Sequence, residues 1–493
     1  MPGQTRARIF FPAALLAGTC LAAGCTQPLG PGFYFAARQT EIHASPGTPD
    51  RLHIRVVDRL ENTGNRTLRS LDVRMPEPPN FGAQNLNVAV DGKMVSPEHD
   101  SVADRRMVRT AFDPPWDHLQ PREITTEWDL TPGASERGTL AVSADGFYIA
   151  DATALPLWQA PSGLFARGGS DPDAEILSIY APPDFRILAP GKPLKRRPDD
   201  ISAPRRFRIQ PHRDFLPYVV AGRYQEQAIR SHDGTVSFWT FRPLDAQAAH
   251  TAAARLSSSE KAFADFFGPA SSGKTVVRIA EAPGDLPSEF SAASGPGGAS
   301  FPEGVLLDSR AIAQGVANEA VLQLSEYELA RTWFGWRMRP TTEAQILLGR
   351  GVGLFGLVIA AEARQPDQRR LMVAFLLDLY DQARAIAPDR RLMESAAEYS
   401  RAERISNGYR AALFFVALED FCGHDNLRAA FRYIIRSREG YETDYEELRA
   451  AVESTSHQDL AEMFRRWLIQ PGVPDDFRAR YANPSAAGLQ TKR

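Results

Sequence analysis

The hydrophobic spacing changes once along this chain of 493 residues, near position 243. Before that point apolar residues alternate with polar ones, as in RLHIRVVDRL, where Leu52 and Ile54 share one face of an extended segment. After it, stretches such as EAVLQLSEYELARTWFG and RRLMVAFLLDLYDQARAI follow helical spacing. The change predicts an α+β multidomain chain, with an N-terminal antiparallel β-sheet domain over residues 38–242 and a mainly α-helical domain over residues 243–475.

Turn signals within the first part support strands. Asp91-Gly92 and Asp233-Gly234 each stand between two β-prone runs, which is typical of a two-residue hairpin. At the other end of the chain, residues 476–493 are polar and are expected to form a flexible tail.

The first 24 residues have the pattern of an export signal. A short basic region precedes the apolar run IFFPAALLAGTCLAA, which is too short to span a bilayer as a stable helix. The run ends in LAAGC at Cys25, which resembles the bacterial lipobox, where the signal is removed before the cysteine and its thiol is acylated. The alternative is an ordinary secretory signal beside an unrelated cysteine. We expect a signal peptide over residues 1–24, a Pro/Gly tether over residues 25–37 and a lipid-anchored protein.

The residue after the cysteine bears on location. By resemblance to lipoprotein sorting in Gram-negative bacteria, the non-acidic Thr26 indicates the outer membrane, with the protein facing the periplasm of the cell envelope. Cys422 is then the only cysteine left without a lipid or a place in the signal, so no intrachain disulfide is expected.

Charge and context exclude two classes of ligand. The formal net charge of −3 gives no reason to expect a nucleic-acid partner. GPASSGKT, from Gly268 to Thr275, matches the phosphate-loop pattern, but a helix precedes it and the strand TVVRIA follows, the reverse of the order that presents a helix N-terminus to phosphate. We expect no nucleotide. The basic stretch Lys192–Arg213 is expected to be a solvated loop, or alternatively a contact for anionic lipid headgroups.

The segment YELARTWFG, from Tyr327 to Gly335, is the chemically informative one. Its spacing predicts an amphipathic helix in which Glu328 and Arg331 contact each other at i,i+3. An H-E-x-x-H helix places two histidines four residues apart to bind zinc, and the glutamate between them activates the metal-bound water. Here the glutamate is present, whereas Tyr327 and Arg331 stand where the two histidines would be.

The surrounding residues resemble one family. YELARTWFG is similar to HELAHQWFG of the aminopeptidase N family of zinc metallopeptidases, a gluzincin group. FFGPASSGKTVVRI, SGPGGASFPEGVLLDS and DLAEMFRRWLIQPGVP resemble the entry, the substrate-holding strand and the closing segment of its catalytic domain. The resemblance spans residues 243–475 and implies a thermolysin-like (gluzincin) fold for the helical domain.

The family's other functional positions also map onto this chain. Its third zinc ligand is a glutamate nineteen residues after the second histidine, which falls on Arg350. NGYRAALFFVALEDFCG resembles the segment that carries the family's transition-state tyrosine. Aligned on Gly423, that position falls on Gly408, with Tyr409 one residue away, so the assignment stays open.

These departures argue against zinc chemistry. All three ligand positions are changed, to Tyr327, Arg331 and Arg350, and a guanidinium stays cationic and cannot become a ligand. No two of the nine histidines are closer than ten residues, so no local histidine pair replaces the lost one. We therefore expect no zinc, although the family uses it, and no catalytic residue; Glu328 is only a retained family position. The two arginines either pair with Glu328 as an internal ion cluster or face the former cleft and bind a carboxylate or another anion.

The sequence favours a lipid-anchored protein of the aminopeptidase N family that has lost zinc and catalysis and acts as a non-catalytic peptide- or protein-binding or scaffold protein. The competing interpretation is an active zinc metallopeptidase of the same family that uses non-standard ligands. A hydrolase without metal is not indicated, because no Gly-x-Ser-x-Gly or other nucleophile pattern occurs.

Overall fold

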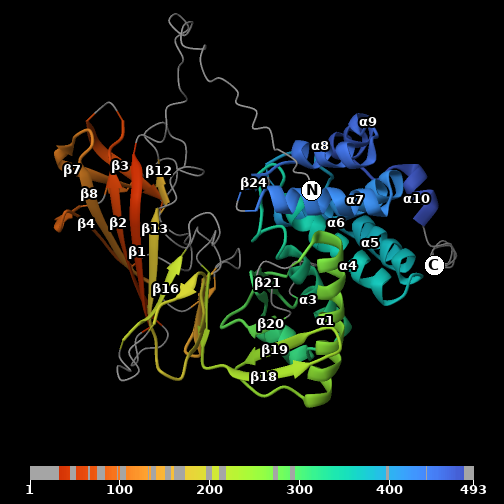
Figure 1. Ribbon diagram of the computed structural model, residues 1–493, viewed down its shortest axis with the longest axis horizontal. Coiled ribbons are helices and arrows are strands. Elements are labelled where there is room, and N and C mark those ends of the chain that lie inside the picture. The colour runs from red at the N-terminus through yellow and green to blue at the C-terminus, as the bar shows by residue number, and fades with distance from the viewer. Residues whose placement is uncertain are drawn as a thin grey trace, which may run out of the picture.

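The structure is a computed structural model. It describes residues 33–44, 51–64, 67–74, 84–96, 98–99, 107–130, 133–134, 140–149, 157–159, 173–195, 203–209, 218–269, 276–288, 295–395, 399–439 and 441–481. Sheets fill the N-terminal part and helices the C-terminal part, which confirms the predicted α+β architecture (Figure 1). The expected signal over residues 1–24 and the lipidation site Cys25 lie outside the described residues.

Three sheets build the N-terminal part. The largest has the order β15 (Lys192–Pro193), β16 (Arg205–Ile209), β13 (Ala174–Tyr180), β1 (Tyr34–Ala44), β2 (Leu52–Glu61), β8 (Pro121–Leu130), β4 (Gln84–Val90) and β5 (Lys93–Val95). The second has the order β14 (Arg186–Leu188), β17 (Val219–Gly222), β11 (Gly146–Ile149), β10 (Leu140–Val142) and β9 (Gly133–Ala134). The third has the order β12 (Leu157–Gln159), β3 (Leu68–Arg74), β7 (Met107–Trp116) and β6 (Glu98–His99).

One core joins these three sheets. Leu52, Ile54 and Val56 on β2 are fully buried in it, as the alternation predicted, and Trp116 and Phe147 reach it from the other two sheets. Among the described strands of this part, β1 and β13 pair in parallel and the other pairs are antiparallel. Because β1 pairs with β13, a segment far along the chain is added beside the first strand.

Three expectations for irregular segments need correction. Within the basic stretch Lys192–Arg213, β15 and β16 pair with each other at the edge of the large sheet, so this stretch is not only a loop. Residues 476–481 of the expected tail belong to α10 (Asp475–Tyr481), which buries Phe477 and Tyr481 against the helical core. β1 likewise begins inside the tether expected over residues 25–37.

A fourth sheet opens the second part of the chain. Its order is β18 (Gln225–Arg230), β19 (Thr235–Thr240), β20 (Val276–Glu281), β22 (Gly304–Leu307) and β21 (Gly298–Phe301). It crosses the boundary expected between residues 242 and 243, since β19 pairs in parallel with β20. A Cβ on Gly304 would lie 1.8 Å from the carbonyl oxygen of Arg278, so the close pairing of β20 with β22 requires glycine there.

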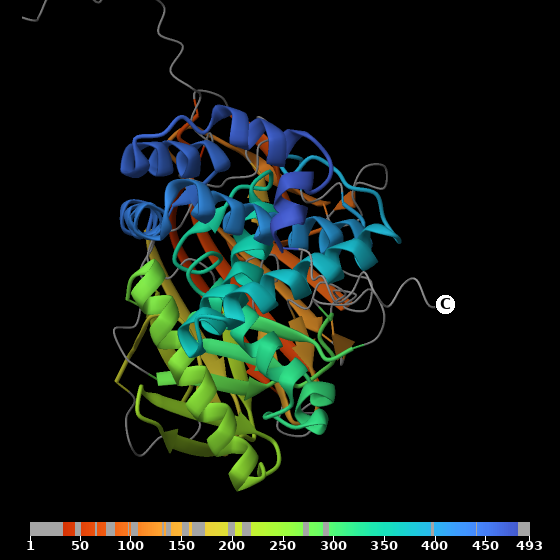
Figure 2. The same ribbon diagram turned by 90° about the vertical axis from the view of Figure 1, so that its right-hand side faces the viewer.

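Helices cover this sheet and extend beyond it. They are α1 (Ala246–Phe267), α2 (Ser309–Gln314), α3 (Glu319–Arg331), the π-helix η2 (Gln345–Gly351), α4 (Val352–Arg364), α5 (Gln368–Arg384), α6 (Arg401–Cys422), α7 (His424–Ser437), α8 (Tyr445–Ser456), α9 (Ala461–Phe464), the π-helix η4 (Arg465–Ile469) and α10. The short strands β23 (Arg339–Pro340) and β24 (Glu442–Thr443) pair beside them. Figure 2 shows α1 lying across the sheet. The N-caps Asp245 of α1 and Ser400 of α6 accept backbone hydrogen bonds, which fixes where both helices begin.

One helical run is long and apolar enough to cross a membrane. It spans Gln345–Arg364, with a mean hydropathy of 1.7, but 78% of it is buried inside the fold. It is therefore explained as a core helix, formed by η2 and α4, and carries no argument for a membrane span among the described residues.

The N-terminal part and the second part share a packed layer. Tyr148 on β11 and Tyr218 next to β17 pack with Phe301 on β21 and Trp336 in one buried cluster. β11 therefore lies against the part of the molecule that carries α3, and the N-terminal part can supply side chains there.

Candidate functional site

Helix α3 carries the three positions that the sequence singled out first. Asn318 caps its N-terminus by accepting a hydrogen bond from the Ala320 backbone N–H at 3.0 Å, and Arg331 stands in its last turn. Tyr327 and Glu328 are fully buried, at 0% exposure. A charged side chain with no solvent exposure needs an opposite charge or several hydrogen bonds, so the partners of Glu328 define this site.

Arg331 is such a partner. Its Nη1 donates to Glu328 Oε2 at 2.9 Å and to Oε1 at 3.2 Å, which confirms the predicted i,i+3 contact. The Arg331 Cζ atom lies 5.3 Å from the centroid of the Tyr327 ring, within the range of a cation–π contact. The Arg331 side chain is 30% exposed, so one face of this buried pair reaches solvent.

Glycines make room for the large side chains at these positions. A Cβ on Gly353, at the start of α4, would lie 2.7 Å from both Arg331 Cγ and Tyr327 Cε2. Atoms this close cannot coexist, so the tyrosine and the arginine occupy the volume that any other residue at position 353 would need.

The same relation holds for Arg350 on η2. A Cβ on Gly408 of α6 would lie 2.7 Å from Arg350 Nε and 2.8 Å from its Cδ. The neighbouring Tyr409 is 2% exposed on α6. Of the two candidates for the family's tyrosine position, Gly408 therefore lies directly against the Arg350 side chain.

Tyr148 is a site residue that the sequence did not indicate. It comes from β11 in the N-terminal part and is fully buried, and its hydroxyl has no hydrogen-bond partner among the described residues. Burial, and secondarily the negative charge of Glu328, raise the pKa of Tyr148 well above its ordinary value. The hydroxyl thus stays protonated near Glu328 as an unused hydrogen-bond donor. No spacing rule connects position 148 to position 328, so only the fold reveals it.

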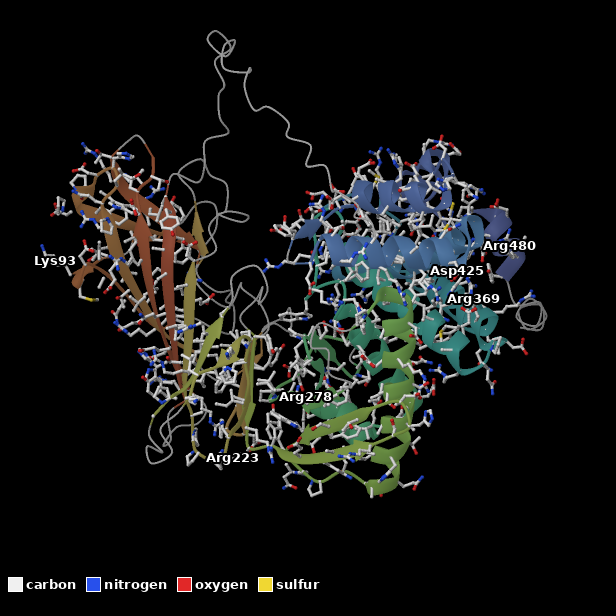
Figure 3. The ribbon with its side chains drawn as sticks, in the orientation of Figure 1. Lys93, Arg223, Arg278, Arg369, Asp425 and Arg480 are labelled. Atoms are coloured by element: carbon white, nitrogen blue, oxygen red, sulfur yellow. The ribbon has the colours of Figure 1, made fainter. Side chains whose placement is uncertain are left out.

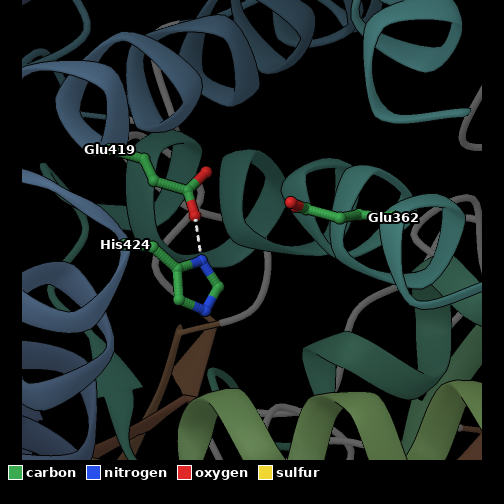
Figure 4. Close-up of side chains that lie close together, drawn as sticks. All are labelled: Glu362, Glu419 and His424. Atoms are coloured by element: carbon green, nitrogen blue, oxygen red, sulfur yellow. Dashed lines mark hydrogen bonds and ion pairs between the residues drawn. The ribbon is translucent and has the colours of Figure 1, made fainter. Parts of the chain in front are cut away.

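A second group of titratable side chains lies elsewhere on the helices. One ligand atom from each of Glu362, Glu419 and His424 falls within 4.8 Å of the others, and His424 Nδ1 is 2.6 Å from Glu419 Oε1 (Figure 4). These residues come from α4, α6 and the start of α7, so the sequence spacing gave no sign of them.

A guanidinium already neutralises that group. Arg369 Nη2 donates to Glu419 Oε2 at 2.6 Å, and Arg369 Nε lies 3.3 Å from Glu362 Oε2. Arg369 also approaches Asp420, which pairs with Arg480 on α10, and Figure 3 shows both arginines at this end of the helical part. A divalent cation bound to the two glutamates would meet Arg369 at close range, so the group is explained as an ion-pair network.

That network is also remote from Glu328. Arg350 and Glu362 are twelve residues apart across η2 and α4, or about 18 Å along a helix, and Gly408 and Glu419 are eleven apart along α6, or about 16 Å. The carboxylates of this group therefore cannot join the side chains around Glu328 in one metal site.

Comparisons with known proteins agree with this architecture. No protein-family profile and no curated protein matches the chain. Among solved structures, the M1 zinc metallopeptidase of Deinococcus radiodurans superposes with a TM-score of 0.57 at 15% identity, over 90% of this chain and 95% of that one. A mutant of that enzyme bound to the substrate Tyr-Ser-Ala gives the same values. A two-domain M1 zinc metallopeptidase mutant bound to L-tryptophan has a TM-score of 0.55 at 15% identity, with 90% and 96% covered.

At this identity the comparisons establish the fold. The chain is similar to M1 zinc metallopeptidases, the aminopeptidase N family, in its N-terminal β-sheet part followed by a helical part. The resemblance drawn from YELARTWFG and its neighbours is therefore supported at the level of structure.

Proposed function

We propose that this chain is a lipid-anchored envelope protein with the M1 metallopeptidase fold that has lost zinc and hydrolysis and acts as a non-catalytic peptide- or protein-binding or scaffold protein. The observation that carries this proposal is the ion pair between Glu328 and Arg331. The glutamate that would activate a metal-bound water is instead held by a guanidinium, at one of the positions where the fold family places a zinc ligand.

The residues present do not fit a zinc ion. A tyrosine and two arginines stand at the three ligand positions, and Arg331 places a permanent positive charge 2.9 Å from the Glu328 carboxylate. Gly353 and Gly408 leave space that Tyr327, Arg331 and Arg350 fill. This matched packing supports a site rebuilt as a stable interior and not one that has merely lost its metal.

A site without zinc can still bind a peptide. The part-exposed guanidinium of Arg331 suits a carboxylate, since arginine presents paired donors to planar anions. One structural neighbour is bound to Tyr-Ser-Ala and others to single amino acids, so short peptides with a free C-terminal carboxylate are the ligands to test first.

The soluble form without the lipidated cysteine, residues 26–493, is expected to bind Tyr-Ser-Ala without cutting it. Isothermal titration should detect the peptide, and replacing its terminal carboxylate by an amide should weaken binding by about tenfold or more, because the charge-assisted hydrogen bond to Arg331 is lost. Mass spectrometry after prolonged incubation with added zinc should find the peptide intact. Equal binding of both peptide forms would remove the anion-binding role of Arg331.

Zinc content separates this proposal from the competing one, an active metallopeptidase with non-standard ligands. Elemental analysis should find no stoichiometric zinc held at Glu328. A matched variant, Y327H/R331H/R350E, restores the family's ligand types and is expected to gain about one zinc per chain if it folds. Zinc-dependent hydrolysis by the unmodified chain would overturn the proposal. Loss of this hydrolysis in the variant Glu419→Gln would then assign the metal to the group of Glu362, Glu419 and His424.

The lipid anchor is a separate part of the proposal, since it rests on the sequence alone. Replacing Cys25 by serine is expected to move the protein from the membrane to the soluble periplasmic fraction, because two or more acyl chains on one residue give stable anchoring. Cys20→Ser is the matched control: Cys20 lies within the removed signal, and its loss should leave anchoring unchanged. Retention of the Cys25→Ser protein in the outer-membrane fraction would contradict the anchor.

A further inference from the structure

A row of four polar side chains crosses the outer face of the large N-terminal sheet. The strand register aligns Asp129 on β8 with His53 on β2, His53 with His43 on β1, and His43 with Tyr180 on β13. Neighbouring residues on these strands, such as Ile54, point into the core, so the row faces solvent. Ten residues separate the two histidines in the sequence, and only the antiparallel pairing of β1 with β2 brings them together.

Each histidine ring is held by a neighbour. His53 Nδ1 lies 3.0 Å from Asp129 Oδ1, and a carboxylate at one ring nitrogen fixes the tautomer that leaves Nε2 as the free acceptor. His43 stacks on the Tyr180 ring, with centroids 4.0 Å apart and planes 7° from parallel. The two imidazoles are thus oriented by groups outside the pair, which is the usual support of a metal-binding histidine.

The two imidazole rings lie slightly farther apart than they would on one shared ion, and the ligand atoms of His43, His53 and Glu41 do not all fall within 4.8 Å of one another, as those of Glu362, Glu419 and His424 do. The two imidazole centroids are 6.0 Å apart, and two imidazoles on one tetrahedral ion are separated by about 5 Å. Glu41, two residues before His43 on the same face, places Oε2 3.7 Å from His43 Nε2. This is too long for a hydrogen bond but near the roughly 3.4 Å between two ligand atoms on a tetrahedral metal. The side chains are 37% and 42% exposed for His43 and His53, so small rotations can close the set.

The charges around the row permit a cation. Arg55 lies 3.6 Å from Glu41 but donates at 2.9 Å to Glu127, and Arg51 lies 3.9 Å from Asp129. Both guanidinium groups are well exposed and can turn away, unlike Arg369 in the buried helical network.

From this geometry we infer that His43 and His53, with Glu41 as a third ligand and Asp129 orienting His53, form a surface site for a divalent transition-metal ion of the class that prefers imidazole, such as Zn²⁺, Cu²⁺ or Ni²⁺. The site is independent of the region around Glu328. It belongs to the N-terminal sheet and needs neither the family resemblance nor the proposed peptide binding.

Titration calorimetry of the soluble form, residues 26–493, with zinc chloride, nickel chloride and copper chloride tests the site. We expect one ion per chain, and we expect His43→Gln and His53→Gln each to weaken binding by about a hundredfold, since each removes a ligand. Asp129→Asn should weaken it by about tenfold, the usual effect of an outer-shell carboxylate. His232→Gln is the matched control: its imidazole is 94% exposed beside a single carboxylate, and binding should be unchanged.

Two results would overturn the inference. One is the absence of a binding isotherm with all three ions. The other is metal binding that persists in the His43→Gln/His53→Gln double variant, which would place the ion elsewhere. Loss of that binding on Glu419→Gln would then assign the ion to the group of Glu362, Glu419 and His424. Because the His43 and His53 side chains are 37% and 42% exposed, unchanged thermal unfolding of the apo histidine variants should show that the fold is retained. The zinc content of the region around Glu328 should be measured in the His43→Gln/His53→Gln double variant. Zinc bound at the N-terminal sheet then cannot be mistaken for zinc bound near Glu328, so the two proposals are tested separately.

Discussion

Arg331→Leu is expected to lower the free energy of unfolding by about 2–3 kcal/mol. Glu328 is fully buried, and the substitution removes the guanidinium that donates to both its carboxylate oxygens while keeping an apolar stem beside Tyr327. Breaking a fully buried ion pair typically costs about 3–5 kcal/mol, and the 30% exposure of Arg331 reduces this because water can reach the remaining charge. Urea denaturation of the two proteins measures the difference through the midpoint and the slope of the transition.

The chain contains a matched control for this substitution. Glu462 and Arg465 form an ion pair with the same i,i+3 spacing, but their side chains are 71% and 50% exposed. Arg465→Leu should therefore leave the midpoint almost unchanged, since exposed pairs contribute little. The double variant Glu328→Gln/Arg331→Leu should recover most of the loss, because no buried charge is left behind. Equal effects of Arg331→Leu and Arg465→Leu would mean that Glu328 does not depend on its arginine.

Local patterns predicted much of this structure. Asp91 and Gly92 have φ of 47° and 76° and join β4 to β5, and Asp233-Gly234 joins β18 to β19, as the hairpin signals indicated. α1 ends before Gly268 and β20 begins at Val276, which is the helix-before-strand order that argued against a phosphate loop. Each of these features is decided within a few residues, where turn chemistry and periodicity act directly.

Such local patterns could not predict the contacts between segments that are distant in the sequence. The parallel pairing of β1 with β13 joins two segments that are far apart in the sequence, and no local spacing predicts it. The approach of Tyr148 to Glu328 and the grouping of Glu362 with Glu419 follow from how sheets and helices pack. At the site, the sequence predicted the Glu328–Arg331 contact because it lies within one helix turn. It could not predict that Gly408 leaves the space that Arg350 occupies.

Gly353→Ala is expected to lower the free energy of unfolding by about 1–3 kcal/mol. The added methyl group would lie 2.7 Å from Tyr327 Cε2, and the Tyr327 ring is fully buried and has no free volume to enter. The loss is expected although alanine favours helices over glycine by about 1 kcal/mol. Thermal and urea unfolding of the variant measure the net effect.

Gly349→Ala separates overpacking from any general effect of replacing a glycine in this helical run. A Cβ there would meet its nearest atoms at 3.9 Å, an ordinary contact, so this variant should be neutral or slightly stabilised. The clash at position 353 should also shrink when Tyr327 is replaced by leucine, because the ring edge is removed and the Arg331 stem can move outward. Such coupling would mean that the tyrosine, the arginine and the glycine act as one packed unit, so replacing Tyr327 or Arg331 alone by histidine would disturb the interior before a metal could bind. An uncoupled Gly353→Ala would instead indicate that the Tyr327 and Arg331 side chains pack loosely around position 353.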